Sequence, residues 1–388
     1  MKKVMFLLLS IMASTGFADT KTSLDLSHRY FWEEPAYEGQ ASEQTSLAFQ
    51  TEMYFKSSAT DDFLVNLFGR VDSADSERDH IDVRELLWRH YGENYQLDAG
   101  VGIVYWGVAE SQRLVNVINQ RDSLEDVLGN VALGQPMIKL EIPLDSSQWE
   151  IYLLPYFRER DFAGEEGRLR TPMVVNADHA RYESSQEEQH VDYSLRYSGN
   201  YENVDYGIAY FEGTQRDPIL MYDSMLNELY PFYSQMKQLG VDFQYTGDTW
   251  LWKLEALYRD TSNDQYAATV FGFEKSFYGI SDSGADIAWL MEYNWDERKK
   301  RSPSYFQNDL FSGIRWVLNN TDGTELLVGI LYDFDYETHF SRLRLNSRIG
   351  ADWAVAMEAY LFNNVGNDDP LKAAENDDFI QLSLKYYF

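Results

Sequence analysis

Six histidines are the residues of this sequence with the widest chemical repertoire, and none lies in a pattern that catalysis or metal binding requires. No pair has the spacing of metal ligands, and none accompanies a recognisable nucleophile motif. A catalytic histidine could sit in a loop, and four of the six lie in or beside segments expected to be loops: His80, His179, His190 and His339. Since nothing else supports hydrolysis, we expect no catalytic residue, no enzymatic activity and no cofactor.

An acidic cluster near the C-terminus could offer oxygen ligands to a cation. It contains Asp368, Asp369, Glu375, Asp377 and Asp378. Carboxylates are hard ligands that suit Ca²⁺, and they could also share divalent ions with lipopolysaccharide phosphates. The spacing matches no EF-hand, so a solvated acidic loop is favoured. Four of these residues, Asp368, Asp369, Asp377 and Asp378, remain minor metal candidates.

A row of arginines follows one face of an expected strand at 339–349. Arg342, Arg344 and Arg348 share the same parity, as period-two alternation requires. Two interpretations stay open. The row could form a basic ladder on the wall of a pore and orient polar solutes, or it could be neutralised by Asp333 and Asp335 of the preceding strand.

The segment 107–134 is too apolar for a solvated loop. Its aliphatic residues are Leu114, Val115, Val117, Ile118, Leu124, Val127 and Leu128. If this segment folded into a pore, it could bury them against the wall and narrow the passage. Its charged residues Glu110, Arg113, Arg121 and Asp122 would then join the arginine row at a constriction. A hydrophobic lid over the mouth, or a contact for another protein, is the alternative.

The elements that would position these residues are strands with a period of two. Alternation of apolar and polar residues is clear at 191–197, 204–210, 250–259, 285–295 and 324–336. The apolar faces carry Tyr and Trp near their ends, which is typical of strands that face lipid and meet both membrane interfaces. A soluble β-sandwich would more often end such faces in aliphatic residues. The pattern therefore favours a membrane barrel.

Turn signals set the number of strands. Eight short polar turns are expected at 57–62, 92–95, 145–148, 199–204, 246–249, 280–284, 319–324 and 350–353. Nine more variable connections are expected at 33–42, 73–80, 107–134, 158–189, 213–229, 260–265, 297–308, 337–341 and 363–377. Together they separate eighteen strands, and sixteen is possible if one hairpin is misassigned. Short turns alternating with longer outer loops are what a single-chain outer-membrane barrel requires.

Composition excludes other classes of protein. The 388 residues carry a net charge of -30, 15% aromatic residues, no cysteine and a mean hydropathy of -0.45. No apolar run beyond the N-terminus is long enough for a membrane helix, and the aromatic content is too high for a disordered chain. The acidic excess repels polyphosphate, so we expect no nucleic-acid partner.

The N-terminus reads as an export signal. Lys2 and Lys3 precede an apolar stretch at 4–12, and small residues at Gly16 and Ala18 fit a signal-peptidase site. We expect residues 1–18 to be a signal peptide, cleaved near Ala18, and residues 19–388 to form one barrel domain.

The last ten residues alternate and end in an aromatic residue. This segment resembles the C-terminal strand of Gram-negative outer-membrane proteins, which the barrel-assembly machinery recognises. The resemblance implies that Tyr386 and Phe388 form an assembly signal and that the chain resides in the cell outer membrane, in contact with lipid and lipopolysaccharide.

Two further resemblances concern the third outer loop. Tyr105-Trp106-Gly107, Glu110-Ser111 and the run 116–122 are similar to a Trp-Gly, Glu-Ser, Asn-x-x-Asn-x-x-Asp signature in a group of uncharacterised proteobacterial outer-membrane proteins. Gln120 stands where that group has proline. The loop also looks like the inward-folded third loop of general porins.

These observations predict an all-β fold, a single transmembrane antiparallel up-and-down β-barrel of about 18 strands with its third outer loop folded inward. The expected function is a porin-like channel for passive diffusion of small polar solutes, constricted by loop 107–134. The alternative is a non-conducting barrel that acts in surface assembly, export or adhesion. Solute identity and oligomeric state stay open.

Overall fold

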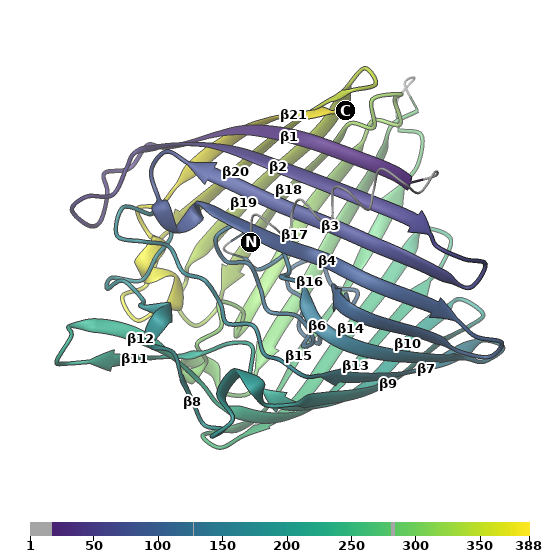
Figure 1. Ribbon diagram of the computed structural model, residues 1–388. Helices are drawn as coiled ribbons and strands as arrows, with labels where there is room; N and C mark the ends of the chain where they lie inside the picture. The colour runs from purple at the N-terminus through teal and green to yellow at the C-terminus, as the bar shows by residue number, and fades with distance from the viewer. Residues whose placement is uncertain (1–17, 127, 281–283) are drawn as a thin grey trace.

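The computed structural model describes residues 18–126, 128–280 and 284–388. Eighteen antiparallel strands form one sheet that closes on itself, because β1 (Ala18–Phe31) pairs with both β2 (Glu43–Lys56) and β21 (Phe379–Tyr387) (Figure 1). Closure leaves no open edge of unpaired backbone groups. The expected signal peptide lies outside the described residues except for Ala18, as does Val127 of the third loop. No helix in the described ranges is long and apolar enough to span a membrane.

The other barrel strands follow in chain order, each antiparallel to its neighbours. They are β3 (Asp61–Asp72), β4 (His80–Tyr91), β5 (Gln96–Gly102), β6 (Gln135–Pro143), β7 (Ser147–Leu154), β9 (Asp192–Tyr201), β10 (Val204–Thr214), β13 (Gln235–Thr246), β14 (Trp250–Thr261), β15 (Gln265–Phe277), β16 (Asp286–Asp296), β17 (Asn308–Val317), β18 (Glu325–Asp333), β19 (His339–Ile349) and β20 (Trp353–Asn363). Short 3₁₀ helices occur at η1 (Ser76–Arg78), η2 (Ala177–His179), η3 (Glu187–Gln189), η4 (Lys299–Arg301) and η5 (Pro370–Ala374).

The predicted count of eighteen strands is confirmed, and the eight short turns and nine outer loops fall where the sequence indicates. A second, three-stranded sheet was not expected. It joins β8 (Arg181–Tyr182), β11 (Ile219–Asp223) and β12 (Glu228–Tyr233). The first two lie in segments predicted as plain loops, whereas β12 extends beyond the predicted loop 213–229, because the connection continues to residue 234 before β13 begins. β8 comes from a different loop than the β11–β12 hairpin and pairs parallel with β12. Such pairing between loops leaves no periodic signal in either one.

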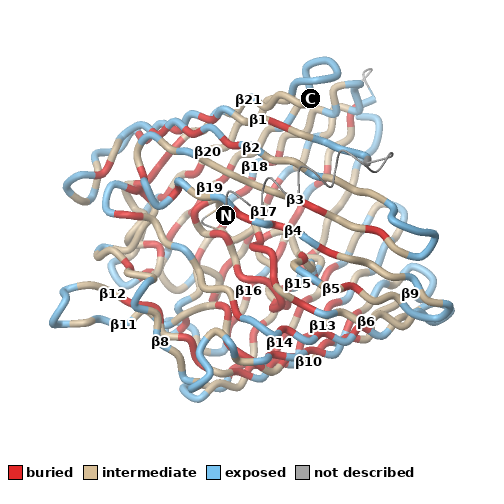
Figure 2. Tube along the Cα trace, viewed as in Figure 1, coloured by how far each residue is buried: buried red, intermediate tan, exposed pale blue. Residues whose placement is uncertain are grey.

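The two faces of each strand differ as the alternation predicts. On β14, Tyr258 is exposed on the outer surface, whereas the inward Glu255 and Leu257 are buried. On β18, Val328 is exposed and its inward neighbour Gly329 is buried. Buried positions recur along the wall near β10 and β13 and in the chain that crosses the barrel interior (Figure 2). An apolar outer face is what hydrocarbon requires of a barrel.

The last strand carries a cluster of aromatic residues beside the seam where it pairs with β1. The ring of Tyr386 lies 4.6 Å from the ring of Trp353 and 5.0 Å from that of Phe388. Phe388 is exposed, and its backbone N–H donates to the carbonyl of Thr22 at 2.9 Å. Both residues of the expected assembly signal therefore lie where the last strand meets the first.

Candidate functional site: the loop inside the barrel

The connection between β5 and β6, residues 103–134, folds into the barrel interior. We call residues 104–119 its first limb and 120–133 its return limb. Val115, Val117 and Ile118 of the first limb are at most 2% exposed and pack in one cluster with inward residues of β4, β6, β7, β10 and β13. The apolar composition of the loop is thus explained by burial inside the barrel, as predicted.

Glu255 on β14 anchors the first limb through backbone donors. Its carboxylate, fully buried, accepts hydrogen bonds from the N–H groups of Val108 at 2.7 Å, Ala109 at 2.8 Å and Val115 at 3.1 Å. Gly107 permits this approach: its φ is +96°, and a Cβ there would lie 2.5 Å from the carboxylate oxygen.

Glu292 on β16 repeats the arrangement one step further along the loop. It is 1% exposed and accepts from the N–H groups of Glu110 at 2.8 Å and Ser111 at 2.7 Å. Within the described ranges, neither Glu255 nor Glu292 has a Lys, Arg or His within ion-pair distance. Five backbone N–H groups instead satisfy these two buried charges.

The side chain of Glu110 reaches the arginines of the far wall. It contacts Arg315 on β17 at 2.7 Å and Arg342 on β19 at 3.2 Å. Arg342 is 5% exposed and stacks 5.0 Å from the ring centre of Phe311. The loop therefore lies over Arg342. The contact joins Glu110 and Arg342, two residues that the sequence singles out.

The other arginines of the row have different surroundings. Arg344 lies 3.6 Å from Glu358 on β20, and Arg348 is exposed beside the ring of Tyr387. The idea that Asp333 and Asp335 neutralise the row is wrong. The register places glycine and leucine of β18 opposite Arg342 and Arg344, and it leaves both aspartates at the outer end of β18. The row spans the barrel height, so one neighbouring pair could not serve it.

The return limb is held by side-chain ion pairs to β3 and β4. Asp122 contacts Arg84 at 2.5 Å, and Glu125 forms two 2.7 Å contacts with Arg70. Burial raises the pKa of the Glu125 carboxyl, but Arg70 and Arg78 outweigh it and hold this pKa below its usual value.

Arg121 and Arg113 lie at the edges of the loop. Arg121 is 4.0 Å from Asp217, which also contacts Arg160 at 2.7 Å. Burial opposes ionisation of Asp217, but the surrounding guanidinium groups hold its pKa well below the usual value. Arg113 lies over the ring of Tyr105 at 4.7 Å.

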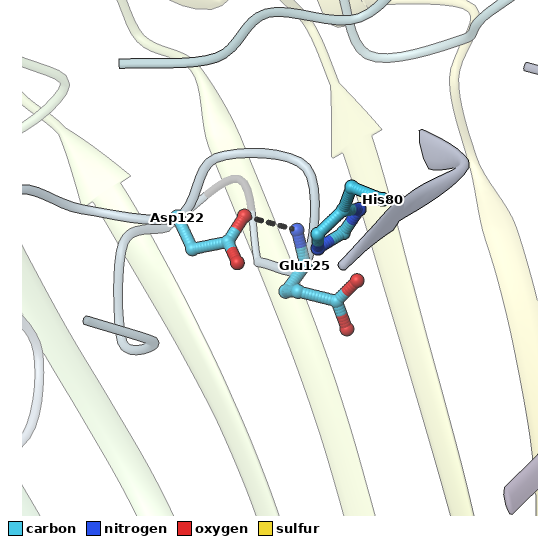
Figure 3. Close-up of side chains that lie close together, drawn as sticks. All are labelled: His80, Asp122 and Glu125. Atoms are coloured by element: carbon cyan, nitrogen blue, oxygen red, sulfur yellow. Dashed lines mark hydrogen bonds between the residues drawn. The ribbon is translucent and has the colours of Figure 1, made fainter. Parts of the chain in front are cut away.

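One group of potential metal ligands lies at the return limb. Atoms of His80, Asp122 and Glu125 lie within 4.8 Å of one another (Figure 3). Both carboxylates are already engaged by Arg84 and Arg70, so the local positive charge comes from guanidinium groups. The geometry is that of a loop anchor.

The minor metal candidates near the C-terminus lie apart. Asp369 caps η5 through Leu371 N–H at 2.7 Å, Asp377 pairs with Arg168 at 2.5 Å, and Asp378 accepts from Phe362 N–H at 2.6 Å. Asp368 is exposed. Among the described residues these four form no common ligand set.

Two cavities flank the loop. One of about 290 Å³ lies between the return limb and the β1–β4 wall, with both signs of charge in its lining: Asp25, Arg70, Arg84, Glu125 and Lys385. One of about 500 Å³ lies at the short-turn end, beside Trp106, Arg196 and Asp242. Tyr105 is the residue that lines both cavities.

The outer loops pack across the mouth of the barrel. The loop 155–191 contacts others through Gln40, whose amide donates to the Gly167 carbonyl at 2.8 Å, and through Asp75, which accepts from Gly164 N–H at 3.2 Å. The side chains of Arg168 and Asp377 are each 2% exposed in their ion pair. The mouth is therefore partly covered.

Comparison with known proteins places the fold. No protein-family model matches the sequence, and no curated protein does. The solved Wzi of Escherichia coli, described as a carbohydrate-binding barrel involved in group 1 capsule assembly, has a TM-score of 0.53 at 11% identity, covering 100% of this chain and 88% of Wzi. OccAB1 of Acinetobacter baumannii has a TM-score of 0.53 at 6% identity, covering 96% of each chain. At such identities the likeness shows an outer-membrane β-barrel fold alone.

Proposed function

We propose that the protein is a porin-like channel of the outer membrane for passive diffusion of small polar solutes, narrowed by the loop 107–134. The observation that carries the proposal is the charged cavity that remains beside a loop bound across the barrel interior. A wall of mixed charge suits hydrated polar solutes better than apolar ones.

The proposed path follows the β1–β4 wall. The opposite side is filled by the apolar cluster and by the contacts of Glu255, Glu292 and Arg342 with the first limb. Solute would therefore pass Arg70 and Glu125 and then Tyr105, which lines both cavities. Arg342 lies on the filled side, so its proposed role is to hold the interior loop in place.

The outer membrane is the proposed location, with lipid and lipopolysaccharide around the barrel and the assembly machinery as a transient partner. The apolar outer face, the closed sheet and the terminal aromatic seam support this placement. No catalytic role is proposed.

The second candidate is a non-conducting barrel in surface assembly, export or adhesion. One observation favours it: loop 155–191 crosses the mouth and buries the Arg168–Asp377 pair. In that case the outer loops would bind a partner, and the interior loop would serve as a plug.

Single-channel recording in planar bilayers separates the two candidates. A channel gives reproducible steps in the unaltered protein, and Tyr105→Ala enlarges them because it removes a ring that lines both cavities. Tyr201→Ala, at the exposed last residue of β9, is the matched control and leaves the steps unchanged. Silence of both the unaltered protein and Tyr105→Ala would contradict the channel and favour the plugged barrel.

A further inference from the structure

Two buried carboxylates face each other at the outer rim without a cationic partner. Asp309 lies at the start of β17 and Asp333 ends β18, and the register pairs them directly across the strands. They are 0% and 5% exposed. In the parts of the chain that the structure describes, no Lys, Arg or His lies within ion-pair distance of either. Like charges directly opposite each other, and out of water, destabilise a sheet.

Unpartnered oxygen atoms gather at the same place. Oδ1 of Asp309 and Oε1 of Gln307 are buried and accept no hydrogen bond, and Gln307 itself is 0% exposed. The Gln307 amide nitrogen donates to Asp333 at 2.5 Å, so its free oxygen lies beside that carboxylate. Oδ2 of Asp335, two residues after Asp333, is a third unpartnered buried oxygen. Buried acceptors without donors are rare, and here they occur together.

Among the described residues, only neutral donors compensate these charges: the N–H of Asn308 donates to Asp309 at 3.0 Å, and the N–H groups of Asp335 and Tyr336 donate to Asp333. On the barrel side lies an apolar cluster that includes Phe311, Leu331 and Phe340, against which residues 305–306 pack. Asp369 from the loop before β21 adds a further negative charge that acts on both Asp309 and Asp333. The Asp309–Asp333 pair therefore lies between an apolar cluster and a further carboxylate, that of Asp369.

We propose that Asp309, Asp333 and the amide oxygen of Gln307 bind a divalent cation of the Ca²⁺ class at the outer ends of β17 and β18. These are hard oxygen donors, and Ca²⁺ accepts irregular sets of carboxylate, amide and backbone oxygens completed by water. No histidine or cysteine is part of the set, which disfavours zinc. Asp335 and Asp369 supply additional charge. The cation would fix the rim by tying the two strand ends to the outer loops.

The binding test uses full-length mature protein, refolded in detergent without lipopolysaccharide and stripped of metal. Titration with CaCl₂ in a calorimeter is expected to show one saturable site. Tb³⁺ is expected to give luminescence sensitised by tyrosine and displaced by Ca²⁺, since Tyr336 donates its N–H to Asp333 at 2.9 Å. Ca²⁺ is also expected to raise the thermal midpoint of barrel unfolding.

Three variants complete the test. Asp309→Asn and Asp333→Asn keep the side-chain shape, should abolish the saturable site, and should unfold at a higher temperature than the metal-free unaltered protein because they remove repulsion. Asp368→Asn changes an exposed acid of the neighbouring loop and should bind normally. The proposal would be overturned if the unaltered protein had no saturable site. It would also be overturned if Asp309→Asn and Asp333→Asn bound Ca²⁺ as well as the unaltered protein does. Equal loss in Asp368→Asn would overturn it too, because general surface acidity would then explain the binding.

Discussion

The two limbs of the interior loop are held in different ways. The first limb donates five backbone N–H groups to Glu255 and Glu292 and buries aliphatic side chains against the wall. The return limb relies on side-chain ion pairs, chiefly Asp122 with Arg84 and Glu125 with Arg70. The cavity of about 290 Å³ lies beside the return limb.

The two kinds of anchorage respond differently to substitution and to pH. Backbone donors exist whatever side chains the loop carries, so substitutions in the first limb leave this anchorage in place if they spare Gly107, where a Cβ would collide with Glu255. Ion pairs depend on the particular side chains and on pH, so the return limb can change without loss of the barrel. The charged cavity lies beside the return limb, which is the limb held by ion pairs.

Removal of a strand carboxylate is expected to have the largest effect. Glu255→Leu leaves three buried N–H groups without an acceptor, which should cost roughly 2–4 kcal/mol and release the first limb. The measurement is the heat-induced electrophoretic shift of the folded barrel together with conductance, which should rise. Glu274→Leu is the matched control. Glu274 lies on β15, between the strands of Glu255 and Glu292, and it contacts Arg315 but no backbone N–H group in the described part of the loop. Equal effects of the two variants would show that the backbone anchorage has no special role.

Acid is expected to act on the return limb through Glu125. The pKa of Glu125 is held below its ordinary 4.5, so its ion pair stabilises the loop above that pH and loses this contribution as pH falls through the lower folded value. The loss of this ion pair should therefore make conductance increase or become noisy as pH falls below about 4.5. Arg70→Gln should abolish most of this acid response. A transition centred above pH 5 would point to a different group.

Ion selectivity should respond least. The chain carries a net charge of -30, so a modest cation preference is expected at low salt, fading as the Debye length falls below ~8 Å. Arg344→Gln with Arg348→Gln should increase that preference slightly in reversal potentials under a KCl gradient. Arg342→Gln should instead change conductance, since Arg342 holds Glu110. Strong anion selectivity at high salt would contradict this assignment.

The sequence was sufficient for the barrel because its signals are local. Period-two alternation, terminal aromatics and turn residues predicted eighteen strands, and the apolar content of 107–134 predicted its burial. The partners of the loop were not predictable. Glu110 meets Arg342 across 232 positions of sequence, and Glu255 resembles any other inward carboxylate of a strand.

The contacts between the outer loops are likewise not predictable from the sequence. The parallel pair β8–β12 and the buried Arg168–Asp377 contact join segments that share no periodic pattern. The Asp309–Asp333 pair escapes the sequence for another reason: strand adjacency alone offers the arginine row as a partner of Asp333. Only the register of β17 with β18 shows which acid faces it.

The seam between β1 and β21 determines when the barrel can be completed. β1 pairs with β2 on one side, but its other partner is separated from it by nearly the whole chain, with Ser23 opposite Tyr387. Until the last strand has been synthesised and delivered, β1 must keep one row of peptide groups unpaired, which invites association with other chains. Closure is therefore a late event by construction. A chain that stalls before Tyr386 and Phe388 could hold every other hairpin and still remain an open, adhesive sheet.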